Sequence, residues 1–463
     1  MEFGILDTGI FIIYLLGTLA IGWYFKNRTD TSDEFMVANR GLGLSVFIAT
    51  MVATSVGGGT LTGYIGQVYE SGLVILPTVI VFFIIQFLIA KFLAEKVQKF
   101  EGYTAPDVLG KTYGRTSQLL AGISSMIYML GAGPALQAIA LGTVIEVITG
   151  IPFTIGATIA MVIIILYTYF SGMWGVAMTD YFQFVVMAIG VALVGWISLN
   201  QANGWSSVVP SIPSENLSFN ANLPAILKLI LVTSFPTLID GNRYQRFYSA
   251  KDVGVAKKGY YIALLPWFFI YVSIFLLGFT GYVLIPNVPA DKVFASLILQ
   301  TLPIGLKGIV FAALVSAIMS TADSYMLVAA TNFVQDIYKP YINPKATDKQ
   351  ILKVSRISVV VIGIVGLVLA LAVPSVMGVW SIASTAYVAG SFIPMMYALF
   401  FKGKKSNKAA IASIVFAGGG SLVLEVMDMS ILGQSPIFIG IIASLIIFAL
   451  ITYFDKEAVV DNN

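Results

Sequence analysis

Long apolar stretches recur along almost the whole chain, and short polar segments separate them. A helix needs roughly 20 predominantly apolar residues to cross the hydrocarbon core of a bilayer, so the pattern predicts about thirteen membrane-spanning helices and no soluble domain. The predicted spans are 5–25, 42–69, 73–95, 117–145, 152–171, 175–199, 223–243, 259–285, 301–334, 354–374, 376–401, 407–427 and 435–455.

Two of these spans carry signatures of a broken helix. The span 42–69 contains Ala53-Thr-Ser-Val-Gly-Gly-Gly-Thr60, and the span 223–243 contains Pro236 and Gly241. Glycine costs about 1 kcal/mol against alanine in a helix. Freed backbone at membrane depth is tolerated only where it is buried in protein or lines a cavity. Interruptions at corresponding positions of two halves indicate an inverted-repeat transporter with its site near the midplane.

The same correspondence predicts how the chain is divided. We expect a first five-helix repeat at 41–200 and a second at 223–403, joined by an external loop at 201–222. An additional N-terminal helix and its loop precede the repeats at 1–40. Two additional helices and a tail follow them at 404–463.

Basic residues predict the orientation, because lysine and arginine concentrate in cytoplasmic loops. Of the 26 basic residues, those outside the predicted cytoplasmic segments are Lys228, Lys292 and Lys307. This assignment counts Arg243 and Arg246 as cytoplasmic. It puts the N-terminus outside and the C-terminus in the cytoplasm.

Composition fits a membrane protein, with 58% hydrophobic and 11% charged residues and a mean hydropathy of +0.90. Soluble domains carry about 25% charged residues. The chain has no cysteine and no histidine. Structural disulfides, Cys/His metal sites and catalytic pairs that use these residues are therefore excluded. We expect no enzyme.

Three carboxylates, Asp180, Asp240 and Asp323, fall within predicted spans, where ionisable groups are functional candidates by default. With no lysine or arginine expected mid-span, sodium or a proton would neutralise them. Asp180 either caps a helix after a turn at Gly172, or forms a second cation site or exit gate with Asp323 and Ser324. Asp240 either pairs with Arg243 or Arg246, or faces the substrate.

A polar stripe runs along the predicted span 301–334. Ala317, Ser320, Thr321 and Ser324 recur at intervals of three and four residues and share one helical face, with Asp323 beside them. Such hydroxyls can hold helices together in a membrane. Alternatively, Ser320 and Thr321 join carbonyls freed at the Gly57 break in a five-oxygen sodium site.

Four motifs together resemble the sodium/solute symporter family: the break from Ala53 to Gly59, FSGMWGVAMTD ending at Asp180, RYQRFYSAKD at 243–252, and VSAIMSTADS at 315–324. The resemblance, strongest to its choline-transporter-like branch, covers about residues 5–400. It implies an all-α, LeuT-like five-plus-five inverted repeat with discontinuous helices.

The resemblance also implies ligands. It places the principal sodium site on the carbonyls of Ala53, Val56 and Ala317 and the hydroxyls of Ser320 and Thr321. A second cation site, which some members have, would use Asp180, Ser320, Asp323 and Ser324. Many members have a serine at the position of Asp323, and a carboxylate there should bind a cation more tightly or hold a proton.

The substrate is less defined. Aromatic residues that cage choline in the similar branch are replaced by Ser55, Gly133 and Asp240, which argues against cation–π recognition. Without a mid-span arginine, an organic acid has no bidentate partner. A zwitterion, an amine or a neutral polar solute remains. The expected contacts are Ser55, Gly58, Thr60, Gln137, Asp240 and Asn242, with an interhelical hydrogen bond as the alternative role of Gln137.

The sequence thus predicts a sodium-coupled symporter that imports a small polar organic solute by alternating access, with one or two sodium ions. Proton coupling on the same fold is the nearest alternative, and a non-transporting solute sensor or a channel is a more distant one. We expect the cell membrane of a prokaryote, the monomer as functional unit, and no nucleic-acid partner.

Overall fold

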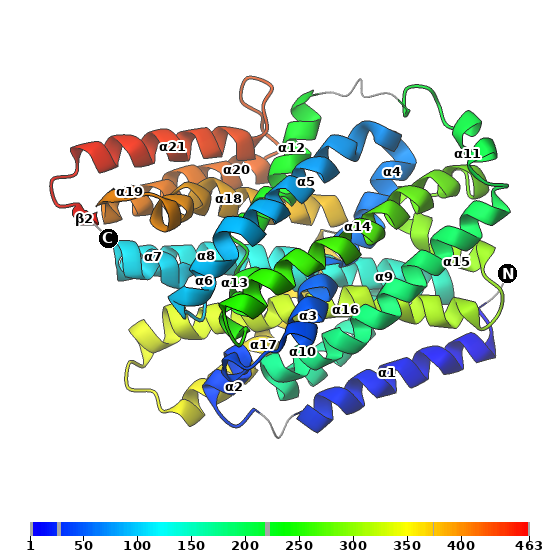
Figure 1. Ribbon diagram of the computed structural model, residues 1–463, viewed down its shortest axis with the longest axis horizontal. Helices are drawn as coiled ribbons and strands as arrows, with labels where there is room; N and C mark the ends of the chain where they lie inside the picture. The colour runs from blue at the N-terminus through cyan, green and yellow to red at the C-terminus, as the bar shows by residue number, and fades with distance from the viewer. Residues whose placement is uncertain (1–2, 26–28, 218–222, 374, 462–463) are drawn as a thin grey trace.

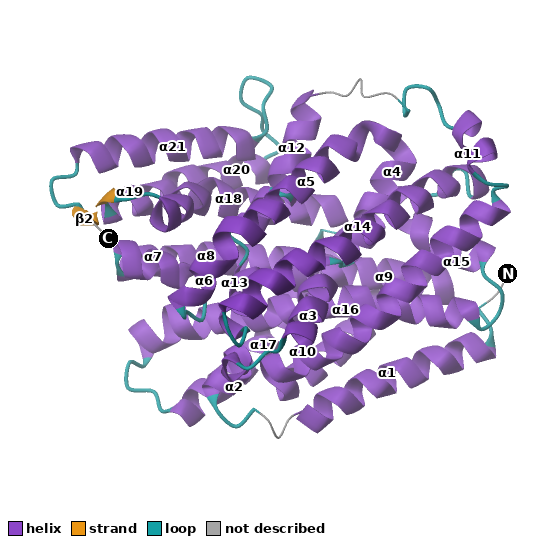
Figure 2. Ribbon diagram, in the orientation of Figure 1, coloured by secondary structure: helices purple, strands orange, loops and turns teal. Residues whose placement is uncertain are grey.

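Helices make up nearly all of the molecule (Figures 1 and 2). The structure, a computed structural model, describes residues 3–25, 29–217, 223–373 and 375–461. The strands among these residues are β1 (Gly403–Lys405) and β2 (Val459–Asp461), which pair antiparallel. The two chain ends lie at opposite ends of the molecule in Figure 1.

The first half of the chain is helical up to the predicted external loop. Its helices and helical turns are α1 (Ile5–Phe25), α2 (Ser32–Val37), η2 (Ala38–Arg40), α3 (Leu44–Ser55), η3 (Gly59–Tyr64), α4 (Ile65–Ser71), η4 (Gly72–Ile75), α5 (Leu76–Leu88), η5 (Ile89–Leu93), α6 (Ala94–Phe100), α7 (Pro106–Tyr113), α8 (Arg115–Leu130), η6 (Gly131–Ala135), α9 (Leu136–Thr149), α10 (Phe153–Gln201) and α11 (Trp205–Ser211).

The second half of the chain is also almost entirely helical. It contains α12 (Leu223–Thr233), η7 (Phe235–Leu238), α13 (Gly241–Ser249), α14 (Val253–Leu284), η8 (Ala290–Lys292), α15 (Val293–Thr301), α16 (Leu306–Asn332), η9 (Phe333–Ile342), α17 (Asp348–Ala372), α18 (Val376–Phe400), α19 (Asn407–Ala412), η10 (Ser413–Gly418), α20 (Gly419–Val426) and α21 (Pro436–Phe454). Residues 218–222 of the predicted external loop lie outside the described residues.

Length and composition identify 11 helical runs among the described residues that can cross a bilayer. Two of them are long enough for two crossings: the run Gly59–Phe100 has 42 residues and α10 has 49. At 1.5 Å per residue α10 would be about 74 Å long, more than twice the roughly 30 Å hydrocarbon core. Both runs contain a glycine with positive φ, Gly72 at 59° and Gly172 at 54°. Both glycines fall where the sequence predicts turns, and the count of thirteen stays a prediction.

The first broken span is interrupted where the sequence predicts. Helix α3 ends at Ser55, and the π-helical turn η3 starts at Gly59. A Cβ atom on Gly57 would lie 2.5 Å from Thr321 Oγ1, and one on Gly59 would lie 2.6 Å from the Trp380 ring. Glycine is therefore required for the close approach of this break to α16 and α18.

The second broken span is also interrupted at the predicted residues. Helix α12 ends at Thr233, the short turn η7 carries Pro236, and α13 begins at Gly241. Asp240 caps α13 by accepting a hydrogen bond from the Asn242 amide, with 3.0 Å between the atoms. An aspartate at this position satisfies an otherwise unpaired amide at the start of the helix.

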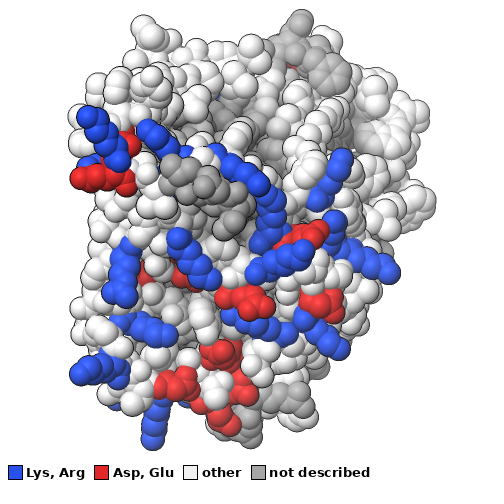
Figure 3. All heavy atoms as spheres, turned by 60° about the vertical axis from the view of Figure 1, so that its left-hand side comes forward, with Lys and Arg blue, Asp and Glu red and all other residues white. Residues whose placement is uncertain are grey.

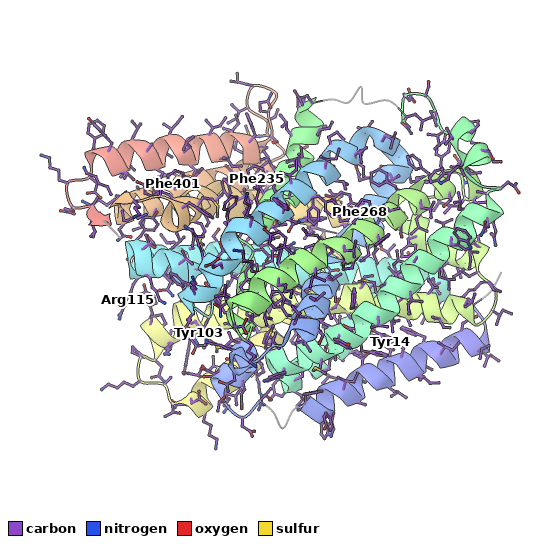
Figure 4. All side chains as sticks on the ribbon, in the orientation of Figure 1. Tyr14, Tyr103, Arg115, Phe235, Phe268 and Phe401 are labelled. Atoms are coloured by element: carbon purple, nitrogen blue, oxygen red, sulfur yellow. The ribbon has the colours of Figure 1, made fainter. Side chains whose placement is uncertain are left out.

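Helix α16 lies at the centre of the bundle, with nearly all of its side chains buried. Aromatic contacts join the surrounding helices to one another. Tyr14 of α1 stacks on Phe182 of α10, with ring centroids 6.1 Å apart, and Phe235 of η7 contacts Phe392 of α18 at 5.2 Å. Figure 4 labels Tyr14 and Phe235, which lie on opposite sides of the bundle. Charged side chains gather over one broad face of the molecule (Figure 3).

Candidate functional site

The candidate sodium ligands of α16 meet the break in the first broken span. Ser320 Oγ lies 3.1 Å from the Ala53 carbonyl oxygen, and Thr321 Oγ1 lies 3.0 Å from that of Thr54. Both hydroxyls also lie near the Ala317 carbonyl, at 3.0 and 3.2 Å. Oxygens roughly 3 Å apart can share one small hard cation, which takes oxygen ligands at about 2.4 Å.

Four of the five predicted sodium ligands are thus adjacent, and the carbonyl of Thr54, which the sequence did not nominate, joins them. Val56 is the residue after α3, and its amide donates to the Ala53 carbonyl over 3.1 Å. Among the described residues, no group of three or more carboxylates is present to hold a metal ion. The ligand set here is made of neutral oxygens instead.

The expectation that no arginine lies among the buried carboxylates is wrong. Arg246 is 1% exposed and forms an ion pair with Asp180, with 3.1 Å between Nη2 and Oδ2. It also donates to Thr54 Oγ1, to Ser324 Oγ over 2.6 Å, and to the side chain of Asn242. The sequence of helix α13, GNRYQRFYS, is so polar that it predicts a loop outside the membrane. Its residues are nevertheless all buried, so Arg243 and Arg246 are not in a cytoplasmic loop.

The predicted ligands of the second cation site do not converge on one point in this arrangement. Asp180 and Ser324 are brought together by the Arg246 guanidinium, and Asp180 Oδ2 also accepts from Thr50 Oγ1 over 2.5 Å. Asp323 instead accepts from the Tyr167 hydroxyl over 2.8 Å. Its Oδ1 has no hydrogen-bond partner among the described residues. The predicted role of Asp180 as a simple helix cap is also wrong, because Asp180 lies inside the helical segment that follows the Gly172 interruption and its carboxylate pairs with Arg246.

A cavity of about 60 Å³ lies beside the candidate sodium ligands. Thr54, Gly57 and Thr321 line it, so the cavity and the sodium ligands share a wall. Four of the predicted substrate contacts also line it: Ser55, Thr60, Gln137 and Asp240. Gly58 and Asn242 do not. Gly58 donates its amide to Gln137 Oε1 over 2.7 Å, and Asn242 accepts from Arg246.

Gln137 fulfils the interhelical role and still faces the cavity. Its Oε1 accepts from Gly58 in the first broken span, and its Nε2 donates to the Ala132 carbonyl over 3.1 Å. The side chain therefore fixes the break against α9 while contributing to the cavity wall.

Aromatic rings, none of which the sequence assigned to the site, form much of the cavity wall. They are Tyr64, Phe82, Tyr128, Tyr271, Tyr325 and Trp380. A Cβ atom on Gly133 would lie 2.3 Å from Tyr325 Cβ, so Tyr325 fills the space beside this glycine. Rings from other helices therefore line the cavity, although Ser55, Gly133 and Asp240 supply none, and the loss of cation–π recognition stays a prediction. Tyr325 follows Thr321 by four residues, which is the signal that could have found it.

One carboxylate and one guanidinium face this cavity. Arg243 Nε lies 3.6 Å from Asp240 Oδ2, and the same oxygen accepts from the Tyr325 hydroxyl over 3.3 Å. Arg243 also donates to Tyr260 over 2.8 Å and lies over the Trp267 ring at 5.5 Å. Its Nε has no hydrogen-bond partner among the described residues. Asp240 therefore pairs with Arg243, as one alternative predicted, and it also lines the cavity; its contact with a substrate stays a prediction.

Two interrupted helices that meet beside a buried cavity are typical of secondary transporters. The sequence pattern of the Sodium:solute symporter family matches residues 35–416, and the chain belongs to this family. The chain is thus a multi-pass membrane protein of a sodium-coupled transporter family.

Similar proteins include three that are named for different solutes. A high-affinity choline transporter of Drosophila melanogaster is 27% identical over 90% of this chain and 71% of its own length. An osmoregulated proline transporter of Bacillus subtilis is 27% identical over 78% and 76%. A sodium/glucose cotransporter of Vibrio parahaemolyticus is 24% identical over 96% and 89%.

Solved structures show the same fold. A Na⁺-coupled sialic acid symporter in a substrate-bound outward-open state matches with a TM-score of 0.86, at 19% identity over 99% of this chain and 100% of that one. MhsT in complex with L-phenylalanine matches with a TM-score of 0.57, at 17% identity over 88% and 98%. These likenesses confirm the LeuT-like fold, and they leave the solute of this chain to the chemistry of its cavity.

Proposed function

We propose that this chain is a sodium-coupled symporter that imports a small polar organic solute by alternating access. The observation that carries the proposal is the shared wall: Thr321 and the Gly57 break contribute both to the sodium ligands and to the cavity. An ion that draws α3 and α16 together also shapes the solute site. Binding of the ion therefore changes the affinity for the solute, and this change couples the two ligands.

The chemistry of the cavity favours a zwitterion. Asp240 can accept from an ammonium group, and Arg243 Nε, which lies 3.6 Å from Asp240 Oδ2 without a hydrogen bond, can donate to a carboxylate. Aromatic rings cover the apolar part of the solute and can also lie against its cationic end. The relatives carry solutes of different charge, so they support sodium coupling rather than one solute.

We further propose that one sodium ion accompanies each solute. Asp180 and Ser324 are already engaged by Arg246, whose guanidinium stands where a second cation would bind. One ion crossing about 100 mV gains roughly 2.3 kcal/mol. A tenfold sodium gradient adds about 1.4 kcal/mol. This driving force suffices to concentrate a neutral or zwitterionic solute roughly 500-fold.

The proposed orientation has the N-terminus outside and the proposed location is a prokaryotic cell membrane. The inverted repeats at 41–200 and 223–403 are the units that would move against each other. One chain supplies every residue of both sites, so the monomer is the proposed functional unit.

The test combines thermal shift with uptake. Purified protein is heated in sodium or potassium with amino acids, amines, sugars or vitamins. A solute at a hundredfold excess over its dissociation constant raises the free energy of unfolding by about 2.7 kcal/mol. We expect a sodium-specific shift that a zwitterion deepens, and sodium-driven uptake of the same solute into proteoliposomes. Uptake driven by a pH gradient without sodium would contradict the proposal.

A further inference from the structure

Two buried polar side chains, Gln86 of α5 and Tyr260 of α14, contact the wall of the central cavity without lining it. An amide at membrane depth is costly unless its groups are paired, and both ends of Gln86 are paired. Its Nε2 donates to Thr237 Oγ1 over 3.1 Å, and its Oε1 accepts from the Tyr260 hydroxyl over 2.6 Å. The Tyr260 oxygen in turn accepts from Arg243 Nη1 over 2.8 Å. We call Thr237, Gln86 and Tyr260 the relay.

The hydrogen bonds of the relay run in one direction from each end of Gln86. A guanidinium only donates, so the Tyr260 oxygen accepts from Arg243 and the Tyr260 hydrogen is given to Gln86. Thr237 accepts from Gln86 and donates its own hydrogen to the Ser234 carbonyl over 2.6 Å. Each donor of the relay is therefore used, and no member can turn away without leaving a buried group unpaired.

The relay and Trp267 together fix the orientation of Arg243. Tyr260 holds Nη1, and the guanidinium lies over the Trp267 ring at 5.5 Å. Because the guanidinium is planar and rigid, holding one nitrogen and one face also sets the direction of the other nitrogens. Nε is thereby kept 3.6 Å from Asp240 Oδ2 without a hydrogen bond. Without the relay, Arg243 would be free to close onto Asp240, and the two charges would satisfy each other instead of a solute.

We propose that Tyr260 and Gln86 are positioning residues that set the preference of the central cavity for solutes that carry a carboxylate. They act through Arg243, whose guanidinium they hold away from Asp240 and available to the solute. Thr237 at one end of the relay and Arg243 beyond its other end both line the cavity, so the relay braces the wall at two points. The inference rests on the zwitterion class proposed for this cavity.

The test compares solutes that differ in the carboxylate alone. The probes are the protein amino acids and their α-carboxamides, in which an uncharged amide replaces the carboxylate and the amino group stays. Thermal shift of the purified protein in sodium, at a pH below the pKa of both amino groups, gives the two dissociation constants. Their ratio is the carboxylate preference. The unfolding temperature without solute checks that each variant is folded.

Two variants interrupt the relay. Tyr260→Phe removes the hydroxyl that anchors Arg243 and keeps the ring, so we expect the carboxylate preference to fall about tenfold, as for one lost hydrogen bond to a charged group. Gln86→Met releases Tyr260 rather than Arg243 itself and should lower the preference about threefold. Tyr261→Phe is the matched control. It removes the hydroxyl of the next residue of α14, whose ring contacts Phe87, and should leave the preference unchanged.

Arg243→Gln decides whether the relay acts through Arg243. This variant should remove most of the carboxylate preference, and adding Tyr260→Phe to it should change the ratio no further, because the two residues share one interaction. A role of Tyr260 in packing alone would weaken the binding of amino acids and carboxamides equally. An unchanged ratio in Tyr260→Phe, or a further fall in the double variant, would overturn the inference.

Failure of the symporter proposal gives a different result. Absence of amino acid binding to the unaltered protein in sodium would overturn the zwitterion class and the role of the relay with it. Binding to the unaltered protein with a ratio that Tyr260→Phe leaves unchanged would overturn the role of the relay alone.

Discussion

The two broken helices are interrupted in the same way but present different chemical groups. The first, at Ala53 to Gly59, offers backbone carbonyls and glycines, and its contacts with Ser320 and Thr321 involve no charged side chain. The second, at Thr233 to Arg246, carries Asp240, Arg243 and Arg246. Neutral oxygens release a small cation easily, whereas fixed charges recognise the ends of an organic solute and neutralise permanent carboxylates. The difference supports the proposal that the first break mainly binds the ion and that the second supplies the charges that recognise the solute.

The largest expected effect is the loss of stability on removing the positive charge of Arg246, which pairs with Asp180. Arg246→Met leaves a buried carboxylate unpaired, which we expect to destabilise the protein by about 3–5 kcal/mol. Unfolding of the detergent-purified protein measures this. Asp180→Asn in the same chain should restore part of the loss, because the two residues interact directly. If the double variant is no more stable than Arg246→Met alone, the ion pair is not the cause.

At the first break, Ser320→Ala together with Thr321→Ala removes two candidate sodium ligands. With about 1.5 kcal/mol lost per ligand, the sodium concentration for half-maximal uptake should rise about a hundredfold. Ser316→Ala is the control, since its hydroxyl bonds the Ala312 carbonyl within α16 and not the break. Unchanged sodium dependence in the double variant would show that the ligand set is wrong.

Gly57→Ala tests the close approach that makes the first break a site. The added methyl would lie 2.5 Å from Thr321 Oγ1 and 2.9 Å from Gln137 Oε1. Overpacking of this kind costs about 1–3 kcal/mol. We expect the sodium concentration for half-maximal uptake to rise roughly tenfold while the expression level stays normal. Gly419→Ala, where nothing lies within 4 Å, should behave as wild type. Equal uptake by the two variants would refute the close approach.

The smallest effect is expected at the second break. Tyr325→Phe removes the hydroxyl that donates to Asp240 over 3.3 Å. A loss of about 1 kcal/mol corresponds to a roughly fivefold rise in the solute concentration for half-maximal uptake. Sodium-dependent thermal shift without solute should not change. Tyr282→Phe, outside the cavity, is the control, and an altered sodium response in Tyr325→Phe would contradict the division of roles.

Much of the fold could be predicted from the chain because its physical cause is local. The apolar runs have the length that a bilayer requires, and glycine and proline mark where the helices are interrupted. The spacing of Ser320 and Thr321 places both on one face of α16. The same spacing includes Tyr325, but periodicity does not reveal what a residue faces. A tyrosine on such a face is packing or a binding wall depending on its neighbours.

An all-helical membrane protein, the positions of its two interruptions and the hydroxyl stripe beside the first of them all follow from the order of the residues along the chain. The sequence did not predict that Arg243 and Arg246 are buried or that Arg246 pairs with Asp180. The segment GNRYQRFYS is too polar to read as membrane-buried. It is stable there because carboxylates and hydroxyls from α10, α3 and α16 satisfy its charges. Those partners lie tens to hundreds of residues away along the chain, so the fold alone brings them together.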